Sequence, residues 1–365
     1  MTYWIDAHQD IACNMLEFGR DLTLSALETR RRETHTPFPA LNGDALVGLP
    51  EYRQAQLAVI FSTLFITPVE YRKAAWETQV FATPDQANKI NHQQIAVYQR
   101  LEEEHPQDFQ RIFNRVGLKE QITPWQTYLW ESSKTLPPIG LITLMEGADS
   151  IRTPDDLDEF WELGVRIISP TWAGNRFCGG TRVPGPLTKE GLALLAGMGE
   201  RGYILDVSHM SEQPMLQALD LYTGDIITTH ANCKALLDPV PYQRHLTDQA
   251  IRMLVARGAV IGVVPFNRFL KADWKDGDPK SDVPLEKLID HMDYICQMVG
   301  DSEHVGIGTD FDGGFGVQSA PKEIDTIADI QKLEGLLSNR GYNHENIEAV
   351  FHSNWLHFLE RTLPA

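Results

Sequence analysis

The sequence has few cysteines, and they lie far apart. Its 365 residues include four, at Cys13, Cys178, Cys233 and Cys296, and no two of them form a Cys-x-x-Cys pair. This spacing indicates neither a disulfide framework nor a thiolate zinc site. A reducing cytoplasm is the simplest expected location, because the first apolar run begins at Tyr3 and leaves no room for a signal peptide.

The sequence also lacks basic charge and long apolar segments. Its 32 lysines and arginines are outnumbered by 50 aspartates and glutamates, which gives a formal net charge of −18. The one basic run, residues 30–32, is flanked by Glu28 and Glu33, so no nucleic-acid partner is expected. No apolar run approaches the ~20 residues that span a bilayer, so no membrane partner is expected either.

Eight short apolar runs are spaced along the chain like the strands of a parallel barrel. They are continuous rather than alternating, as expected for strands buried on both faces. Between several of them, apolar residues recur at helical spacing. The alternation of strand and helix predicts an α/β fold, a TIM-type (β/α)8 barrel. The predicted strands cover residues 3–5, 57–65, 139–145, 165–169, 204–207, 226–229, 259–264 and 305–308, and the predicted helices cover 187–198, 212–221, 247–257 and 284–299.

No Gly/Ser-rich or Pro-rich linker divides the chain, and barrels commonly form one domain above ~250 residues. We therefore expect a single barrel domain over residues 1–365. Two segments depart from the barrel rhythm. Residues 21–50 form a predicted loop rich in charge and Pro, and residues 67–136 form a predicted helical insertion between strands 2 and 3. Thr83 before Pro84 is typical of the start of a helix in this insertion.

Metal-binding or acid-base side chains directly follow five of the apolar runs. Residues just past the C-terminal ends of barrel strands converge on one mouth, so these positions are expected to be neighbours in space. Taken singly, a His-x-Asp pair in a loop or a hydrogen-bonded histidine is more often structural than functional. Taken together, the set predicts a metal site. The candidates are His8, Asp10, Glu146, His209, His230 and Asp310.

The number of candidate ligands favours two metal ions. Three imidazoles and two carboxylates exceed what one tetrahedral zinc needs, and they suit two zinc ions if Glu146 bridges them. Such a pair lowers the pKa of a shared water from ~15.7 towards ~7. Asp310 can then take that water's proton and pass it to a leaving group. The alternative for Asp310 is a turn residue in a Gly-rich loop, which Asp312 fits better, and Asp206 and Asp149 are candidates for supporting or capping roles.

Five segments resemble the membrane dipeptidase, or renal dipeptidase, family of binuclear zinc peptidases within the amidohydrolase superfamily. They occur in the family order and extend over nearly the whole chain. The resemblance implies that His8 and Asp10 bind one zinc ion. It also implies that His209 and His230 bind the second and that Glu146 bridges both. The segments are DAHQD at 6–10, MEG at 145–147, LDVSHMS at 205–211, THAN at 229–232 and GIGTDFDG at 306–313.

The resemblance extends to the residues that act on the substrate. Asp310 matches the family's acid-base aspartate, and Arg244 is similar to the arginine that binds the substrate's terminal carboxylate. A guanidinium presents a planar fork to two oxygens, which suits that task; a surface ion pair is the alternative for Arg244. The expected partner is therefore a small carboxylate-bearing molecule, a dipeptide. The resemblance alone implies a homodimer.

One position departs from the family pattern. After the fourth strand the family usually carries a histidine that helps to polarise the scissile carbonyl, and the matching residue here is Trp172. An indole cannot accept a proton or carry that charge. Either Asn175 or Arg176 reaches into the site instead, or the substrate differs from an ordinary dipeptide.

The sequence predicts a zinc-dependent dipeptidase that hydrolyses small dipeptides by a metal-bridging hydroxide. Two alternatives stay open. The first is an amidohydrolase-superfamily enzyme that acts on another amide, a lactone or an ester, although related branches typically use His-x-His and a carboxylated lysine. The second is a protein that binds metal without turnover, which only Trp172 suggests.

Overall fold

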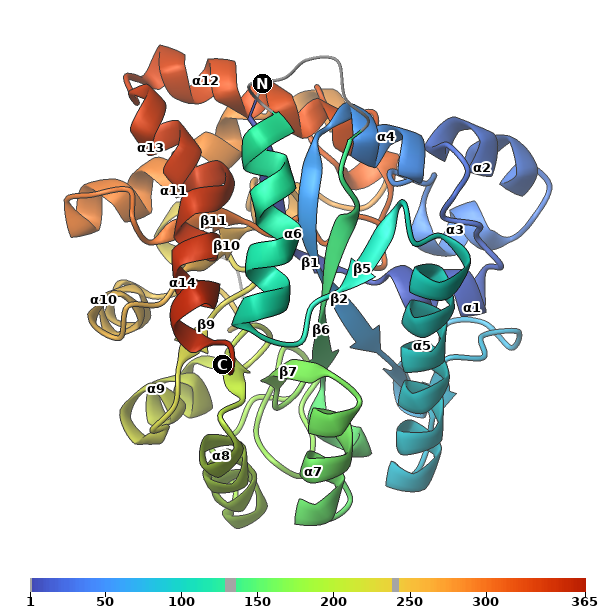
Figure 1. Cartoon of the computed structure of the whole chain (residues 1–365), viewed down its shortest axis with the longest axis vertical. Coiled ribbons are helices and arrows are strands. Elements are labelled where there is room, and N and C mark those ends of the chain that lie inside the picture. Colours follow the sequence, from blue (N-terminus) through green and yellow to red (C-terminus); the bar gives the residue numbers. More distant parts are fainter. Residues whose placement is uncertain (1, 129–135, 238–242) are drawn as a thin grey trace.

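The computed structural model describes residues 2–128, 136–237 and 243–365. Within them, eight parallel strands follow one another around a barrel in the order β10-β11-β1-β2-β6-β7-β8-β9 (Figure 1). Each of the eight predicted runs overlaps one of these strands, so the predicted barrel is confirmed; β1 and β6 extend past the ends of their predicted runs. The strands are β1 (Trp4–Gln9), β2 (Leu57–Phe65), β6 (Ile139–Glu146), β7 (Val165–Ser169), β8 (Ile204–Asp206), β9 (Ile226–Ile227), β10 (Ile261–Val263) and β11 (Val305–Ile307).

The barrel is closed between β9 and β10 by a single parallel bridge. This bridge joins Thr228, just past β9, to Ile261. The Thr228 amide donates to the Val260 carbonyl at 3.2 Å, and the Gly262 amide donates to the Thr228 carbonyl at 2.8 Å. The ring of strands is therefore nearly continuous, as in a TIM-type barrel.

The four predicted helices are all present, each after a barrel strand. Two of them begin at a threonine whose hydroxyl accepts a backbone hydrogen bond, an arrangement that satisfies a free amide of the first turn. Thr188 accepts from the Gly191 amide and Thr247 from the Ala250 amide. The helices are α8 (Lys189–Arg201), α9 (Glu212–Leu221), α10 (Asp248–Ala256) and α11 (Glu286–Val299).

The connection between β2 and β6 is helical, as predicted, but it also contains strands. Thr83 caps its long helix by accepting a hydrogen bond from the Gln86 amide. The sequence analysis did not predict β5, which pairs with the start of β6, because three residues are too short for a periodic pattern. Residues 129–135 of the predicted insertion lie outside the described residues. The elements are β3 (Thr67–Pro68), β4 (Val80–Phe81), α5 (Pro84–Glu104), β5 (Phe109–Arg111) and α6 (Arg115–Tyr128).

The connection between β1 and β2 contains short helices where a loop was predicted for residues 21–50, and that prediction is wrong in this respect. Helix α2 starts at Ser25, whose hydroxyl accepts from the Glu28 amide. The sequence of α2 is almost entirely polar, so no apolar periodicity indicates it. The helices are α1 (Ile11–Glu17), α2 (Ala26–Glu33), α3 (Phe38–Asn42) and α4 (Leu49–Gln54).

The N-terminal end of the barrel is filled by apolar side chains. Trp355 and Phe358 of helix α14 (Asn354–Thr362) belong to one buried cluster with residues of β1, β2 and β6. A Cβ atom at Gly306 would lie only 2.2 Å from Trp355 Nε1, so glycine makes room for the indole. The remaining helices are α7 (Pro154–Glu162), α12 (Lys332–Arg340) and α13 (His344–Glu348). None of the helices in the described ranges is both long and apolar enough to cross a bilayer.

Candidate metal centre

The structure brings all six candidate metal-site residues together at the C-terminal mouth of the barrel. Each is at least nine-tenths buried, from His8 and His230 at 0 % exposure to Asp310 at 8 %. They form three overlapping triads in which the potential ligand atoms lie within 4.8 Å of one another. The triads are His8, Asp10 and Glu146; Glu146, His209 and His230; and His8, His230 and Asp310.

The Glu146 carboxylate lies between the histidines. Its Oε1 atom is 2.8 Å from His209 Nε2 and 3.6 Å from His230 Nε2. Its Oε2 atom is 3.3 Å from His8 Nε2. The same His8 nitrogen lies 3.9 Å from an oxygen of Asp10 and 3.9 Å from an oxygen of Asp310. One carboxylate therefore faces two groups of ligands, as a bridging ligand must.

The Nε2 atoms of the three histidines are placed as in a metal site. His8 Nε2 is buried and has no hydrogen-bond partner among the described residues, although buried polar groups are nearly always paired. His209 Nε2 and His230 Nε2 lie 2.7 Å apart and face each other. Imidazole nitrogens and carboxylate oxygens in this combination are typical zinc ligands. The residues present therefore fit metal ions held on both sides of Glu146.

A shared hydroxyl orients two of the histidines. Thr229 Oγ1 donates to the Asp206 carboxylate at 2.7 Å, and it lies 2.9 Å from His230 Nδ1 and 3.3 Å from His8 Nδ1. A carboxylate only accepts, so the single hydroxyl proton points at Asp206 and both Nδ1 atoms must donate to the oxygen. Both rings then carry a proton on Nδ1, so Nε2 is the nitrogen that each ring would offer to a metal once it carries no proton.

Two further threonines orient the other ligands. Thr181 Oγ1 lies 2.8 Å from His209 Nδ1, and Thr63 Oγ1 donates to a carboxylate oxygen of Asp10. The sequence pattern indicated Asp206 as a supporting residue but none of these three threonines. Thr229 could have been noticed because it directly precedes His230, whereas Thr63 and Thr181 give no comparable signal.

Two of the site residues have unusual backbone conformations. His209 has φ of 66° and Asp310 has φ of 54°, a left-handed region that residues other than glycine seldom adopt. Each such residue costs of the order of 1–3 kcal/mol and persists where its surroundings enforce it. The structure around the mouth of the barrel therefore holds both residues in backbone conformations that an isolated chain would avoid.

Burial and mutual charge shift the pKa values of the cluster in opposite directions. Burial, with the charge of Glu146, raises the pKa of Asp10 to about 7, and burial raises the pKa of Asp310 well above its usual value. Burial lowers the pKa of His8, but Glu146 outweighs it and raises the value to about 10. Burial, with Arg244, lowers the pKa of His209 to about 4, so this ring is neutral at pH 7, the form that binds metals.

A cavity of about 750 Å³ leads to the cluster, and Asp10, Glu146, His209 and Asp310 line it. Arg244 also lines this cavity and is only 2 % exposed, so it is not a surface residue. Its guanidinium donates to the His230 carbonyl at 2.6 Å and lies 4.7 Å from the ring of Phe269. The structure thus places a buried cation beside the candidate ligands.

Trp172 forms part of an aromatic wall of the cavity. Its ring centre lies 5.4 Å from that of Phe65, 5.7 Å from that of Tyr71 and 6.2 Å from that of His209. The Arg182 guanidinium lines the same cavity, 5.9 Å from the Trp172 ring. The sequence analysis did not single out Arg182, because nothing in its neighbourhood distinguishes it from a surface arginine.

Asn175 is not among the residues that line the cavity. Its amide nitrogen donates to Asp149 at 3.0 Å and to the Pro170 carbonyl at 3.0 Å, and its oxygen accepts from the Phe177 amide at 2.9 Å. These contacts shape the loop after β7. Arg176 is similarly engaged, with the Ile151 carbonyl and Glu190. The structure therefore brings Trp172 to the candidate centre but neither of its two suggested substitutes.

A parallel barrel with buried histidines and carboxylates at its C-terminal mouth, reached through a cavity, is typical of metal-dependent hydrolases. The comparison with known families makes this more specific. The profile of the membrane dipeptidase family, peptidase family M19, matches residues 2–363. The chain belongs to this family of metallopeptidases.

Individual relatives agree with the assignment. An uncharacterised protein from the pqqA 5′ region of Klebsiella pneumoniae is 33 % identical over 61 % of this chain and 82 % of its own length. Dipeptidase verJ of Clonostachys rogersoniana is 28 % identical, over 69 % of this chain and 61 % of its own length. The chain thus spans less than two thirds of that dipeptidase.

Solved structures share the fold at low identity. A metallo peptidase from Rhodobacter sphaeroides, liganded with a phosphinate mimic of the dipeptide L-Ala-D-Ala, has a TM-score of 0.75 and 22 % identity over 99 % of both chains. The probable dipeptidase PvdM of Pseudomonas aeruginosa has a TM-score of 0.77 and 18 % identity over 99 % of this chain and 96 % of its own. These likenesses agree with the barrel fold of the described residues.

Proposed function

We propose that this chain is a zinc-dependent dipeptidase that hydrolyses the peptide bond of small dipeptides with two zinc ions. The observation that carries the proposal is the convergence of the ligand set, a general acid-base candidate and a buried arginine at one cavity. Each group alone has a structural explanation, but their combination is what hydrolysis of a carboxylate-bearing amide requires.

The ligand roles follow the geometry around Glu146. His8 and Asp10 would hold one zinc ion on the Oε2 side. His209 and His230 would hold the second on the Oε1 side. When bound, the ions supply Lewis acidity, which polarises a carbonyl and lowers the pKa of a water molecule. The protein contributes buried side chains whose orientations are set in advance, because three threonine hydroxyls hydrogen-bond to the proposed ligands.

Asp310 is the proposed proton carrier. Its buried carboxylate has a raised pKa and so holds a proton more readily than an exposed one. In the reaction it would accept a proton from the attacking water and deliver it to the departing amine nitrogen. Its position 3.9 Å from His8 Nε2 places it at the ligand cluster, within reach of a water and a substrate bound there.

Arg244 and Trp172 are the proposed substrate contacts. Arg244 would bind the terminal carboxylate of the dipeptide, because its guanidinium is buried beside the ligand cluster and carries a permanent positive charge. Trp172, with Phe65 and Tyr71, would provide an apolar wall for a substrate side chain. We assign Asn175 to the shape of the loop, since its polar atoms are used there.

The test is amine release from a panel of L,L- and L,D-dipeptides by the zinc-reconstituted protein, with zinc content measured in parallel. The phosphinate mimic bound by the Rhodobacter sphaeroides relative supports including L,D-peptides. The His209→Ala variant is the metal-site control. We expect turnover that the variant loses. Two bound zinc ions with no turnover on any peptide would overturn the proposal in favour of another amide, lactone or ester, or of metal binding without catalysis.

We further propose that residues 1–365 form a single metallohydrolase barrel domain, with residues 67–136 attached as an insertion. Four cysteines that form no disulfide support function in a reducing cytoplasm. A homodimer remains a proposal from the family resemblance, and light scattering of the purified protein would test it.

A further inference from the structure

The turn that follows β11 is held in an unfavourable conformation. Asp310 and Asp312 both have positive φ, at 54° and 63°, and the Gly313 amide donates back to the Asp310 carbonyl at 2.9 Å. A Cβ atom at Gly313 would lie 2.0 Å from Asp310 Oδ1, so the carboxylate rests directly on this glycine. Strain of this kind persists only where neighbouring groups impose it.

The groups that impose it come from the connection between β1 and β2. The Asp312 carbonyl accepts from the side-chain amide of Asn14 at 3.0 Å and from that of Asn42 at 2.9 Å. The Asp312 carboxylate accepts from the Leu46 amide at 2.8 Å. Its other oxygen lies 3.1 Å from Arg20 Nη1. Asp312 is therefore anchored through both its backbone and its side chain, by residues nearly 300 positions away in sequence.

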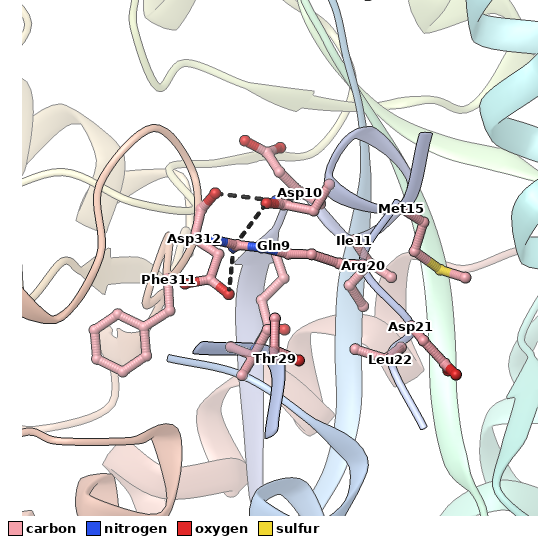
Figure 2. Close-up of a pocket in the computed structure, with 12 residues that line it drawn as sticks. Gln9, Asp10, Ile11, Met15, Arg20, Asp21, Leu22, Thr29, Phe311 and Asp312 are labelled. Carbon is pink, nitrogen blue, oxygen red and sulfur yellow. Dashed lines mark hydrogen bonds and ion pairs between the residues drawn. The ribbon is translucent and has the colours of Figure 1, made fainter. Parts of the chain in front are cut away.

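Arg20 is the centre of this anchorage (Figure 2). Only 8 % of the residue is exposed. Its Nε and Nη2 atoms bond the two oxygens of Glu33 at 2.8 and 3.0 Å, and Nη1 donates to Asn14 Oδ1 at 3.1 Å. A planar guanidinium can join two carboxylates and an amide at fixed angles, which a lysine ammonium cannot.

The same network reaches a candidate metal ligand. Besides Asp312, the Asn14 amide donates to the backbone carbonyl of Asp10 at 2.9 Å. One side chain, itself held by Arg20, therefore ties the segment that carries Asp10 to the turn that carries Asp310. The relative position of these two carboxylates therefore depends on Arg20, which is not among the residues that line the cavity.

We propose that Arg20 is a positioning residue for the hydrolysis: through Asn14 and Asp312 it fixes the Asp310 carboxylate relative to the metal ligands. This proposal rests on the proton-carrier role proposed for Asp310. A displacement of a catalytic carboxylate by about 1 Å can lower the rate of the chemical step about 10²-fold. Substrate affinity need not change, because the carboxylate acts in the reaction and not in binding. The effect of Arg20 is therefore expected in kcat rather than in KM.

The test compares Arg20→Met with Arg166→Met in the zinc-loaded enzyme. Arg166, near the start of β7, is also 8 % exposed, but its guanidinium donates to the backbone carbonyls of Phe113 and Trp161, away from the metal centre. We expect Arg20→Met to lower kcat by about 10–100-fold with KM and zinc content retained. Arg166→Met should lower thermal stability but keep kcat, and Arg20→Lys should recover part of the rate.

A readout without catalysis separates this proposal from the dipeptidase assignment. Hydrogen exchange of residues 306–316 should become faster in Arg20→Met than in wild type, because the turn loses its anchor. If Arg20→Met does not fold, Asn42→Ala removes one hydrogen bond from the Asp312 carbonyl and should lower kcat in the same direction, by less.

Each outcome has a definite meaning. Wild-type turnover with unchanged kcat in Arg20→Met, or equal losses of kcat in Arg20→Met and Arg166→Met, would overturn the positioning role and leave the dipeptidase intact. No wild-type turnover on any dipeptide, together with faster exchange in Arg20→Met, would overturn the dipeptidase and with it the catalytic meaning of the anchor, while the anchor itself would stand.

Discussion

The two ends of the barrel are filled by different kinds of side chain, apolar at one end and polar or charged at the other. At the N-terminal end, Trp355 and Phe358 are buried among aliphatic residues of the strands. At the C-terminal end, His8, Glu146 and Asp310 are buried to a similar degree but are polar or charged. In barrels of this kind the first end provides stability and the second carries chemistry. The contrast shows that burial alone does not indicate whether a residue stabilises the protein.

The buried residues at the two ends also contribute to the stability of the fold with opposite signs. Burying apolar surface stabilises the fold by roughly 25 cal/mol per Å², whereas a buried carboxylate opposes folding unless it is paired. At the mouth, positive φ at His209 and Asp310 adds strain. Substitutions at the mouth should therefore affect catalysis more than stability, and substitutions at the other end should do the reverse.

The largest effect is expected for Glu146→Gln at the mouth. The amide cannot bridge two zinc ions as a carboxylate does, so metal binding should fail and kcat should fall by more than about 10⁴-fold, since metal activation supplies several kcal/mol. The exposed Glu104→Gln is the control. Zinc content and amine release measure the outcome, and a variant that keeps two ions and normal turnover would contradict the bridging role.

Asp310→Asn should lower kcat by about 10²–10⁴-fold, the usual contribution of a general acid-base group, while zinc content is retained. The metal-free variant should also be more stable than wild type at neutral pH. The folded-state pKa of Asp310 is raised, so the ionised carboxylate makes the wild type lose stability as pH rises through that pKa. Thermal unfolding with chelator from pH 4 to 8 should show a difference that grows with pH.

Trp355→Ala tests the opposite end. Removing a fully buried indole should lower the free energy of unfolding by about 3–5 kcal/mol. The kcat of the folded protein, measured well below the unfolding transition, should stay within about twofold of wild type, because the substituted side chain does not touch the cavity. Urea unfolding and steady-state kinetics give both values. A large loss of kcat in folded protein would show that the two ends are not independent.

Thr181→Val, at the C-terminal end of the barrel, is expected to have the smallest effect of these substitutions. It removes the hydroxyl 2.8 Å from His209 Nδ1, and loss of such a partner typically weakens metal affinity by about 10–100-fold. With saturating zinc, kcat should be close to that of wild type. Competition with a metal chelator measures the affinity, and an unchanged value would mean that the loop alone orients His209.

The eight strands were predictable because each begins in a continuous apolar run, and the candidate ligands because polar groups follow those runs. Strand β5 and helix α2 were not, since one is three residues long and the other is polar. Site residues were predictable where they directly follow a predicted strand in the sequence. The positions of Asn175 and Thr181 depend on how the loop after β7 folds back on itself and contacts His209, which no local pattern in the sequence indicates.

The hydroxyl of Thr229 has a consequence for how the metals are acquired. It accepts from His8, a proposed ligand on one side of Glu146, and from His230, a proposed ligand on the other. An ion that binds one of these rings also orders the Thr229 hydroxyl, to which the other ring donates. The second ion then has less conformational entropy to remove from its own ligand, because the first ion has already ordered the shared hydroxyl. Zinc titration of the metal-free protein should therefore be sigmoidal, with both ions entering nearly together.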